Sequence, residues 1–427
     1  MSRFERKAQS QPKHGPPSVS SASKASAPLP SRRPDWNGSG YTKKAVRRRP
    51  ATTVSAQGPT ATVQEQVIQT QLQQLVLDTI RTTFPASDDF DALRPALRDI
   101  KDAIAQHDFD KAFATEESLE TYTIRWTPSR ALAYANVLAS LLQEISEDAW
   151  VERCTRPDGQ KPAKVVSIGR GVAEFMAIAA VLKHLQPHKE DETSEPQSDS
   201  PDMEGKEHDS SSTSNSYPQL RSAPLFEHAV ADVTDWSDVI SKLHDSLTTP
   251  RPLSKYASAK ARASNAATIS PQGLKWSATK LDVLHSEPQH LSAMIGTDPA
   301  LVTLCFTLSE LYPRSLPKTT KLLRQLTVAA PRGTLLLVID HIEAPVTTLV
   351  GRDESEQQEK TYPLHWLFSQ TLLPRRDHYT KGSEGIPKPM WEKLVEDQNR
   401  VFKLPAGLRF PGSLENIKYQ IHILRRL

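Results

Sequence analysis

Two glycines stand between an apolar run and a helix-like run, an arrangement typical of a ligand-binding loop. Residues 165–168 (Val-Val-Ser-Ile) predict a buried strand, Gly169-Arg-Gly171 follows, and residues 172–185 predict a helix. Glycines let a backbone turn tightly and approach a ligand at the carboxyl end of a strand. A structural turn without a ligand has the same local pattern, so the loop needs support from other residues.

The spacing of this loop argues against a dinucleotide site. That fingerprint places glycine at its first, third and sixth positions, and the sixth residue here is Glu174. The sequence Gly169-x-Gly171-x-Ala173 resembles the loop of Rossmann-type methyltransferases, which bind S-adenosylmethionine (SAM). That resemblance implies cofactor contacts at Gly169, Gly171 and Ser167. Ser167 stands where many such enzymes have an acidic residue, and it can bond a ligand without supplying a carboxylate to the methionine ammonium.

Carboxylates follow the next two predicted strands, in positions suited to a nucleoside. Asp232 ends the strand-like run 226–231, where a carboxylate can bond ribose hydroxyls. Asp235 is the alternative, although its position suits a helix N-cap. Asp282 follows the third strand and is placed to meet the adenine edge, while a cap or turn role is its alternative.

The segment after the fourth predicted strand, 301–306, holds the candidate catalytic groups. Methyltransferases of this architecture place substrate-facing residues there. Thr307 can hydrogen-bond the cofactor, Glu310 can accept a proton, and Tyr312 can stack on an unpaired base. The alternatives are that Glu310 complements the macrodipole of the following helix and that Tyr312 packs beneath it.

Alternating strand-like and helix-like segments predict the scaffold that positions these residues. Apolar runs predict strands at 165–168, 226–231, 274–283, 301–306 and 333–340, and an alternating pattern predicts one more at 417–424. Helical periodicity covers 63–80, 85–107, 128–142, 172–185, 235–247 and 315–329. Repeated strand–helix units imply an α/β fold with a mostly parallel sheet covered on both faces. No long helix precedes the last strand, so it can form an antiparallel edge.

Composition divides the chain into ordered and disordered parts. Hydrophobic residues make up 37 % of the 427 residues and prolines number 33, so part of the chain stays outside any core. We predict a disordered basic tail at 1–60, a helical N-terminal region at 61–150 and a Rossmann-type domain at 151–427. Within that domain, polar stretches at 186–224 and about 249–275 predict disordered inserts.

Charge and cysteine usage narrow the function classes. The net charge is only +3, but basic residues concentrate in the first 50 residues, which suits the phosphate backbone of RNA. A solubilising tail or a nuclear import signal is the alternative. Two cysteines, Cys154 and Cys305, are too few for a zinc site, so no metal is predicted and a reducing compartment fits. Apolar runs long enough for a membrane span are absent from the sequence, so we expect a soluble intracellular protein.

Several blocks in a fixed order resemble one family. They are Trp126-Thr-Pro-Ser-Arg-Ala-Leu-Ala-Tyr134, Ile168-Gly-Arg-Gly-Val-Ala-Glu174, Ala231-Asp-Val-Thr-Asp-Trp-Ser237, Leu253-Ser-Lys-Tyr-Ala257, Phe306-Thr-Leu-Ser-Glu-Leu-Tyr312 and the ending at 413–427. Over roughly 115–427 the chain resembles fungal SAM-dependent methyltransferases, a family that includes a 25S rRNA (uridine-N3)-methyltransferase. In that family the first loop is usually richer in glycine, and Arg170 interrupts it here.

The resemblance implies a seven-stranded Rossmann-type sheet, SAM as cofactor and methyl transfer to N3 of a uridine in large-subunit (25S) rRNA. Arg130 and Tyr134 are the expected contacts of the methionine end, because Ser167 carries no charge. We expect a monomer in the nucleus or nucleolus, with the cytoplasm as a second location, acting on rRNA or a pre-ribosomal particle. The alternatives are a methyltransferase for a protein or small molecule, and a non-catalytic RNA-binding ribosome-assembly factor with a decayed Rossmann domain.

Overall fold

The computed structural model describes residues 61–155, 161–186, 225–251, 253–259, 262, 265–342, 345–350, 358–373 and 390–427. Residues 57–427 form one compact unit, and all the elements below belong to it. The predicted basic tail at 1–60 lies outside the described residues, as does nearly all of the predicted insert at 186–224.

The predicted α/β Rossmann-type fold with a mostly parallel sheet is confirmed, but the sheet has eight strands where the resemblance implies seven, because the short strand β1 pairs with β9. The strands run in the order β1-β9-β10-β6-β5-β2-β3-β4. Their bounds are β1 Thr62–Val63, β2 Ala163–Ile168, β3 Phe226–Asp232, β4 Leu274–Lys280, β5 Leu301–Cys305, β6 Leu335–Asp340, β9 Trp391–Phe402 and β10 Ile417–Arg426. The five strands β4, β3, β2, β5 and β6 are parallel, and β10 is antiparallel to both of its neighbours, as its lack of a preceding long helix predicts.

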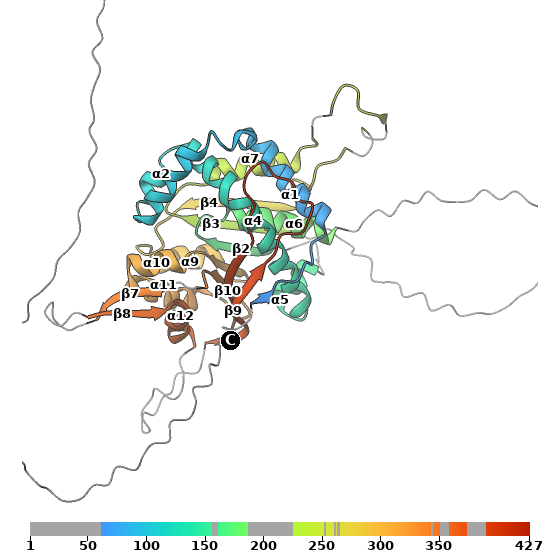
Figure 1. Ribbon diagram of the computed structural model, residues 1–427. Helices are drawn as coiled ribbons and strands as arrows, with labels where there is room; N and C mark the ends of the chain where they lie inside the picture. The colour runs from blue at the N-terminus through green and yellow to red at the C-terminus, as the bar shows by residue number, and fades with distance from the viewer. Residues whose placement is uncertain are drawn as a thin grey trace, which may run out of the picture. The chain divides into compact units, whose positions relative to one another are not determined.

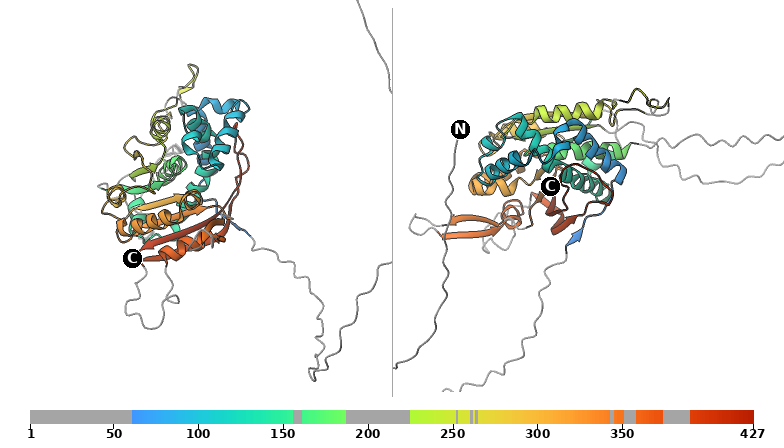
Figure 2. Two further views of the ribbon diagram at one scale, coloured as in Figure 1. Left: turned by 90° about the vertical axis from the view of Figure 1, so that its left-hand side faces the viewer. Right: turned by 45° about the horizontal axis from the view of Figure 1, so that its top comes forward.

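Helices cover both faces of this sheet. One layer contains α1 (Thr70–Thr83), α4 (Glu116–Glu144), α6 (Val172–Leu185) and α7 (Ser237–Thr248), and α9 (Pro288–Ile295), α10 (Leu308–Arg314), α11 (Leu316–Ala329) and α12 (Leu364–Leu372) form the other. Figures 1 and 2 show the two layers on opposite sides of the strands. Each layer has its own core cluster because successive strand residues point to opposite faces. Val165 of β2 belongs to the first cluster and Val166 to the second.

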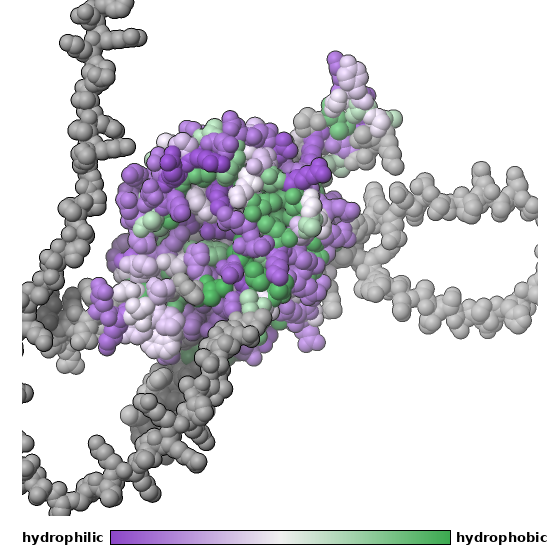
Figure 3. Space-filling view, in the orientation of Figure 1, coloured by the Kyte–Doolittle hydropathy of each residue, from purple (hydrophilic) through white to green (hydrophobic). Residues whose placement is uncertain are grey.

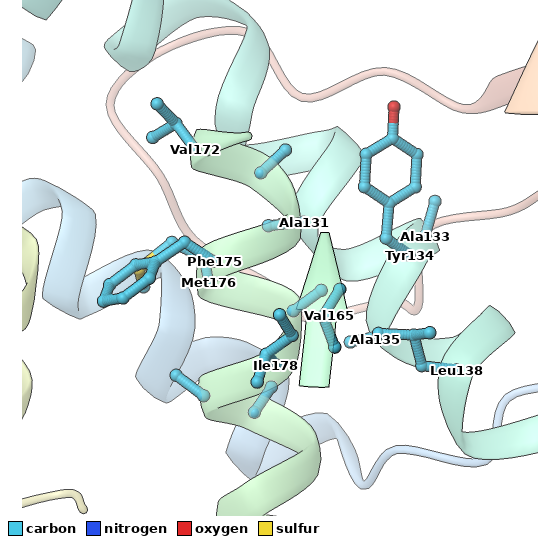
Figure 4. Close-up of a cluster of buried hydrophobic side chains, with 14 of the residues drawn as sticks. Ala131, Ala133, Tyr134, Ala135, Leu138, Val165, Val172, Phe175, Met176 and Ile178 are labelled. Atoms are coloured by element: carbon cyan, nitrogen blue, oxygen red, sulfur yellow. The ribbon is translucent and has the colours of Figure 1, made fainter. Parts of the chain in front are cut away.

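The N-terminal helical region is part of the same unit. Its remaining elements are the 3₁₀ helix η1 (Pro85–Asp89), α2 (Arg94–Ala105), α3 (Phe109–Ala112) and α5 (Ala149–Thr155). β1 pairs in parallel with β9, and α4 packs on α6 through small residues such as Ala131 and Ala135, drawn in Figure 4. These helices therefore share a core with the sheet.

The predicted start of α4 at Pro128 is wrong. The helix begins twelve residues earlier, where Thr115 and Ser118 form a capping box, and Pro128 lies inside it. A capping box satisfies backbone N–H groups that a helix start leaves unpaired, so it fixes the beginning more strongly than an interior proline does. Pro128 is buried together with most residues of α4, and that packing offsets the lost backbone hydrogen bond.

Three features escaped the sequence prediction. β9 carries charged and polar residues along most of its length, and β7 (Pro345–Val350) pairs with β8 (Gln358–Pro363) in a separate antiparallel hairpin. The predicted insert at about 249–275 ends earlier than expected, because Ile269 is already buried in the core. Among the described residues, we find no helix that combines the length and apolar character needed to span a membrane.

Candidate active site

The glycine loop is held tightly between two neighbouring strand ends. Gly169 and Gly171 have φ angles of +120° and +69°, which favour glycine. A Cβ atom on Gly169 would lie 2.7 Å from Oγ1 of Thr307, and one on Gly171 would lie 2.6 Å from Cγ2 of Val230. Thr307 Oγ1 also donates a hydrogen bond to the carbonyl of Ile168 at 2.9 Å. The two glycines therefore let the loop pack against Val230 of β3 and Thr307, which follows β5. The hydrogen bond from Thr307 stabilises the loop in this position.

A first cavity, which we call the strand-end cavity, lies at the carboxyl ends of the parallel strands. Its space is about 440 Å³ when the open solvent at its mouth is counted. Its lining includes Gly169, Asp232, Val233, Leu281, Val283 and Glu310. Apolar residues after β3 and β4 and a carboxylate after β3 suit the flat base and the ribose hydroxyls of a nucleoside.

Asp232 lies in the wall of the strand-end cavity, and its contact with a ribose stays a prediction. Its Oδ1 accepts hydrogen bonds from the backbone N–H of Thr234 at 2.9 Å and from Nε1 of Trp236 at 3.2 Å. These bonds orient the carboxyl group at the cavity wall, and burial raises its pKa. The alternative, Asp235, is exposed and its Oδ1 accepts from the N–H of Ser237 at the start of α7. Asp235 therefore has the structural role that its position suggests.

Asp282 has the structural role that was its alternative. Its Oδ1 accepts from the N–H of Leu284 at 3.0 Å, and its Oδ2 lies 2.9 Å from Nδ1 of His285 and 3.3 Å from Nη2 of Arg314. These partners lower the pKa of a partly buried carboxyl whose own desolvation acts in the opposite direction. Its neighbours Leu281 and Val283 line the strand-end cavity in its place. The expected adenine contact is therefore corrected to a turn role.

A second cavity, the loop cavity, lies between α4 and the start of α6. Its space is about 320 Å³ when open solvent is counted, and its lining includes Arg130, Tyr134, Arg170, Gly171, Glu174 and Cys305. The guanidinium of Arg130 donates to the hydroxyl of Tyr122 at 2.7 Å and lies 4.7 Å from the ring centre of Phe306. In Figure 4 the hydroxyl of Tyr134 points away from the aliphatic cluster of α4 and α6. Arg130 and Tyr134 thus lie together beside the glycine loop, and their contact with the methionine end of the cofactor stays a prediction.

Ser167 cannot contact the cofactor from its position. Its side chain is fully buried, and its Oγ accepts from Oγ1 of Thr303 and lies 2.8 Å from Nε2 of His228. These three side chains belong to the adjacent strands β5, β2 and β3, on the α4–α6 face of the sheet. The predicted cofactor contact at Ser167 is therefore corrected to a hydrogen bond inside the sheet. Burial lowers the pKa of His228 to about 3, so the ring stays neutral.

A third and larger cavity, the basic cleft, opens between α2 and α4. It encloses about 1560 Å³, counting the space at its mouth. The cations in its lining are Arg94, Arg98, Lys101, Arg125, Arg130 and Arg170. Tyr122 and Trp126 add aromatic faces, and Glu310 is the one carboxylate among the residues that line it. Figure 3 shows hydrophilic residues gathered over α2 on this side of the molecule.

Arg170 and Glu310 form the wall that the cavities share. Nη1 of Arg170 donates to Oε1 of Glu310 at 2.9 Å, and both residues line the strand-end cavity and the basic cleft. The guanidinium also lies 5.2 Å from the ring centre of Phe113 and 4.9 Å from that of Tyr122. The residue that interrupts the glycine loop is therefore a stacked, paired cation at the junction of the site.

Tyr312 does not face the cleft. Its ring is 2 % exposed in the core cluster between the sheet and α11, so the predicted stacking on a base is wrong. α10 turns Glu310 toward the cavities and Tyr312, two residues later, into the core, which follows from the helical period. Buried Asp340 accepts from the N–H of Ser309 at 3.0 Å and so anchors the start of α10; burial raises the pKa of Asp340 to about 6. The sequence analysis missed this anchor, as it missed His341 in the lining of the cleft.

Comparison with known proteins agrees with this geometry. Residues 80–425 match the family described as "Putative SAM-dependent methyltransferase". The chain is 24 % identical to the 25S rRNA (uridine(2843)-N(3))-methyltransferase of Saccharomyces cerevisiae over 329 aligned residues. The alignment covers 77 % of this chain and 76 % of that protein.

Solved structures with a similar arrangement are more distant. A SAM-dependent methyltransferase from Methanosarcina mazei is 8 % identical with a TM-score of 0.28, covering 62 % of this chain and 92 % of that one. One from Clostridium acetobutylicum is 8 % identical with a TM-score of 0.26, covering 62 % and 83 %. Scores this low carry no argument, so the fold rests on the strand order. The family match spans most of the chain, and the protein belongs to the family of SAM-dependent methyltransferases.

Proposed function

We propose that this methyltransferase acts on RNA and methylates N3 of a uridine in large-subunit (25S) rRNA. The observation that carries the proposal is the basic cleft, which is rich in cations and adjoins the strand-end cavity. The two cavities meet at Arg170 and Glu310. A polyanionic substrate held in the cleft would thus reach the cofactor across that pair. The similarity to a yeast rRNA uridine-N3 methyltransferase supports the choice of base and atom.

The residues present fit SAM. Asp232 offers a carboxylate to the ribose, Val233 and Leu281 offer apolar contacts to the adenine, and the loop residue Gly169 lines the same cavity. Arg170 Nε is buried without a hydrogen-bond partner in the described part of the chain, which leaves a donor for a ligand. When bound, SAM supplies an electrophilic methyl group.

By this proposal, the residues of the basic cleft bind the phosphates of RNA and a base that has left its helix. Arg98 and Lys101 are exposed on α2, and in the described part of the chain neither has an ion pair. Such cations bind phosphates and position RNA without reading its sequence. The ring of Trp126 offers a face for a base that leaves its helix, because N3 of a paired uridine is hidden.

The N3 proton must be removed, and two groups can help. Glu310 is the carboxylate in the lining of the cleft, so we propose it as the general base. The guanidinium groups of Arg170 and Arg130 can instead stabilise the negative charge that develops on the uridine. Both roles place the reacting base beside the Arg170–Glu310 pair. An rRNA substrate also places the protein, by this proposal, in the nucleus or nucleolus on a pre-ribosomal particle.

Charge reversal in the cleft tests the RNA proposal. The double variant Arg98→Glu/Lys101→Glu should weaken binding to large-subunit rRNA fragments and reduce the slope of log K against log salt by about 1.4 to 1.8, if each residue neutralises one phosphate. SAM affinity should not change, because both side chains lie on α2, away from the strand-end cavity.

The matched control reverses two exposed cations on the opposite layer. Lys321 and Arg324 lie on α11, and the variant Lys321→Glu/Arg324→Glu changes the net charge equally. If both double variants weaken RNA binding to the same degree, the effect is one of total charge and the basic cleft is not the RNA site. Unchanged binding in the Arg98→Glu/Lys101→Glu variant would contradict the proposal directly.

A further inference from the structure

The loop cavity brings one carboxyl group and two guanidinium groups around a small space. Glu174 belongs to the first turn of α6, is 8 % exposed and lines this cavity. Arg130 reaches the cavity from α4, and Arg170 reaches it from the glycine loop. Neither the resemblance nor the sequence pattern assigns Glu174 a ligand. Its charge is opposite to that of its two neighbours, which is the pattern that recognises a zwitterion.

Glu174 is an unusual residue to bury. In the described part of the chain it has no ion pair, and the groups that face it are Arg130 and Tyr134 from α4, the Cys305 thiol at the end of β5, and Arg170 of the glycine loop. Burial raises the pKa of Glu174 to about 7. A role in complementing the macrodipole of α6 would not require burial, since such carboxylates act from exposed first turns. A buried carboxyl group without an ion pair costs stability, and a cationic ligand would offset that cost.

The order of the strands places the loop cavity at one end of an elongated ligand site. The neighbouring strands run β5-β2-β3-β4. Both cavities touch residues at or after the ends of β2 and β5, and of the two, the strand-end cavity alone extends to the residues after β3 and β4. A ligand that lies across these strand ends, with its nucleoside near Asp232, has its other end beside Glu174.

We propose that Glu174 binds the ammonium group of the methionine part of SAM, while Arg130 binds its carboxylate. Glu174 would thus supply the charge that many related enzymes place at the position of Ser167, which here is buried inside the sheet. This inference rests on the family's cofactor and does not depend on RNA as the substrate.

Two ligands that differ only in the amino-acid end test the proposal. S-adenosylhomocysteine carries the ammonium and carboxylate groups, and 5′-methylthioadenosine lacks both. In calorimetry at pH 7.5, Glu174→Gln should weaken S-adenosylhomocysteine at least about tenfold and leave 5′-methylthioadenosine within about twofold. Glutamine keeps the shape of a side chain that is partly neutral near pH 7, so the variant should fold.

The control variant removes a carboxylate from the opposite edge of the sheet. Glu227 lies at the start of β3, where it pairs with Lys164, and Glu227→Gln should change neither affinity. If Glu174→Gln weakens both ligands equally, or neither, the proposal is wrong. If the affinities for both ligands fall, Glu174 maintains the conformation of the loop and does not bind the ammonium group. If neither affinity falls, Glu174 is a buried carboxyl group without a ligand.

The unaltered protein gives an independent measurement. Because Glu174 is neutral below about pH 7 in the free protein, binding an ammonium group must ionise it and release a proton. The affinity for S-adenosylhomocysteine should therefore fall between pH 7 and pH 5.5, by at most about tenfold per pH unit, relative to 5′-methylthioadenosine. Parallel pH profiles for the two ligands would overturn the assignment even if the variant failed to fold.

Discussion

Replacing Gly171 by alanine tests the loop geometry on which the whole site depends. The structure gives two separate costs. The φ angle of +69° costs a residue with a Cβ about 1–2 kcal/mol. The new Cβ would also lie 2.6 and 2.7 Å from the two Cγ atoms of Val230, and overpacking of this kind costs about 1–3 kcal/mol. We therefore expect Gly171→Ala to lower the free energy of unfolding by about 2–5 kcal/mol.

A second glycine separates the two costs. Gly407 has a φ angle of +90°, and a Cβ there would meet nothing within 4 Å. Gly407→Ala should therefore cost only the backbone contribution of about 1–2 kcal/mol. Urea unfolding of both variants, followed by circular dichroism, measures the difference.

A double-mutant cycle then isolates the overlap with Val230. Val230→Ala removes both Cγ atoms, so the strain of Gly171→Ala should be relieved in the double variant. The double variant should be more stable than the sum of the two single effects predicts, by about 1–3 kcal/mol. Strictly additive effects, or equal costs for Gly171→Ala and Gly407→Ala, would refute the loop conformation described above.

Three further predictions concern the base, a buried histidine and the tail. The variant Glu310→Gln keeps the shape of the side chain and removes its charge at the junction of the cavities. If Glu310 is the general base, the turnover rate in single-turnover assays should fall at least about tenfold while RNA affinity is kept. Full activity would instead leave stabilisation of the uridine anion as the mechanism. Burial lowers the pKa of His228 to about 3, so below its ordinary pKa of 6.5 the ring takes up a proton when the protein unfolds. The stability that the neutral buried ring contributes is therefore present above pH 6.5 and is lost as the pH falls toward 3. The unaltered protein should lose about 2 kcal/mol more than His228→Gln between pH 7 and pH 5 in urea unfolding, and equal losses would contradict a neutral buried ring. Removing residues 1–50 should weaken RNA binding and flatten its salt dependence, and a changed target nucleotide would show that the tail determines specificity.

The central strands were predictable because their residues are buried on both faces. β6 is buried at every position, and such runs in β2, β3 and β5 are recognisable without any partner information. β9 carries charged residues such as Glu392 and Lys393 along an exposed surface, so its sequence lacks that signal. The order of the strands and the pairing of β1 depend on contacts between distant residues, which local patterns do not encode.

The candidate site was predicted where chemistry follows a strand end and missed where it depends on which way a side chain points. Asp232 is the last residue of β3, so the strand end alone places it. Ser167 lies one residue before the end of β2. Because side chains alternate between the two faces of a strand, Ser167 points to the face covered by α4 and α6, beside His228. Tyr312 is turned away from Glu310 by the helical period, which was readable from the sequence but required knowing which face of α10 is buried.

Glu174 carried a signal that local reasoning did not use. An acidic residue in an otherwise apolar helix start, residues 172–182, is either exposed or paired. The local sequence does not distinguish these cases, because the side chains that face Glu174 come from the distant elements α4 and β5.

The central claim, methylation of uridine N3 in rRNA, is tested most directly by analysing the nucleosides of the product. Purified protein is incubated with SAM labelled in its methyl group and unmodified large-subunit rRNA, and the digested RNA is analysed by mass spectrometry. We predict labelled 3-methyluridine at one position, and its loss in the Arg98→Glu/Lys101→Glu variant but not in Lys321→Glu/Arg324→Glu. Label on another nucleoside, or on protein or small molecules only, would contradict the account.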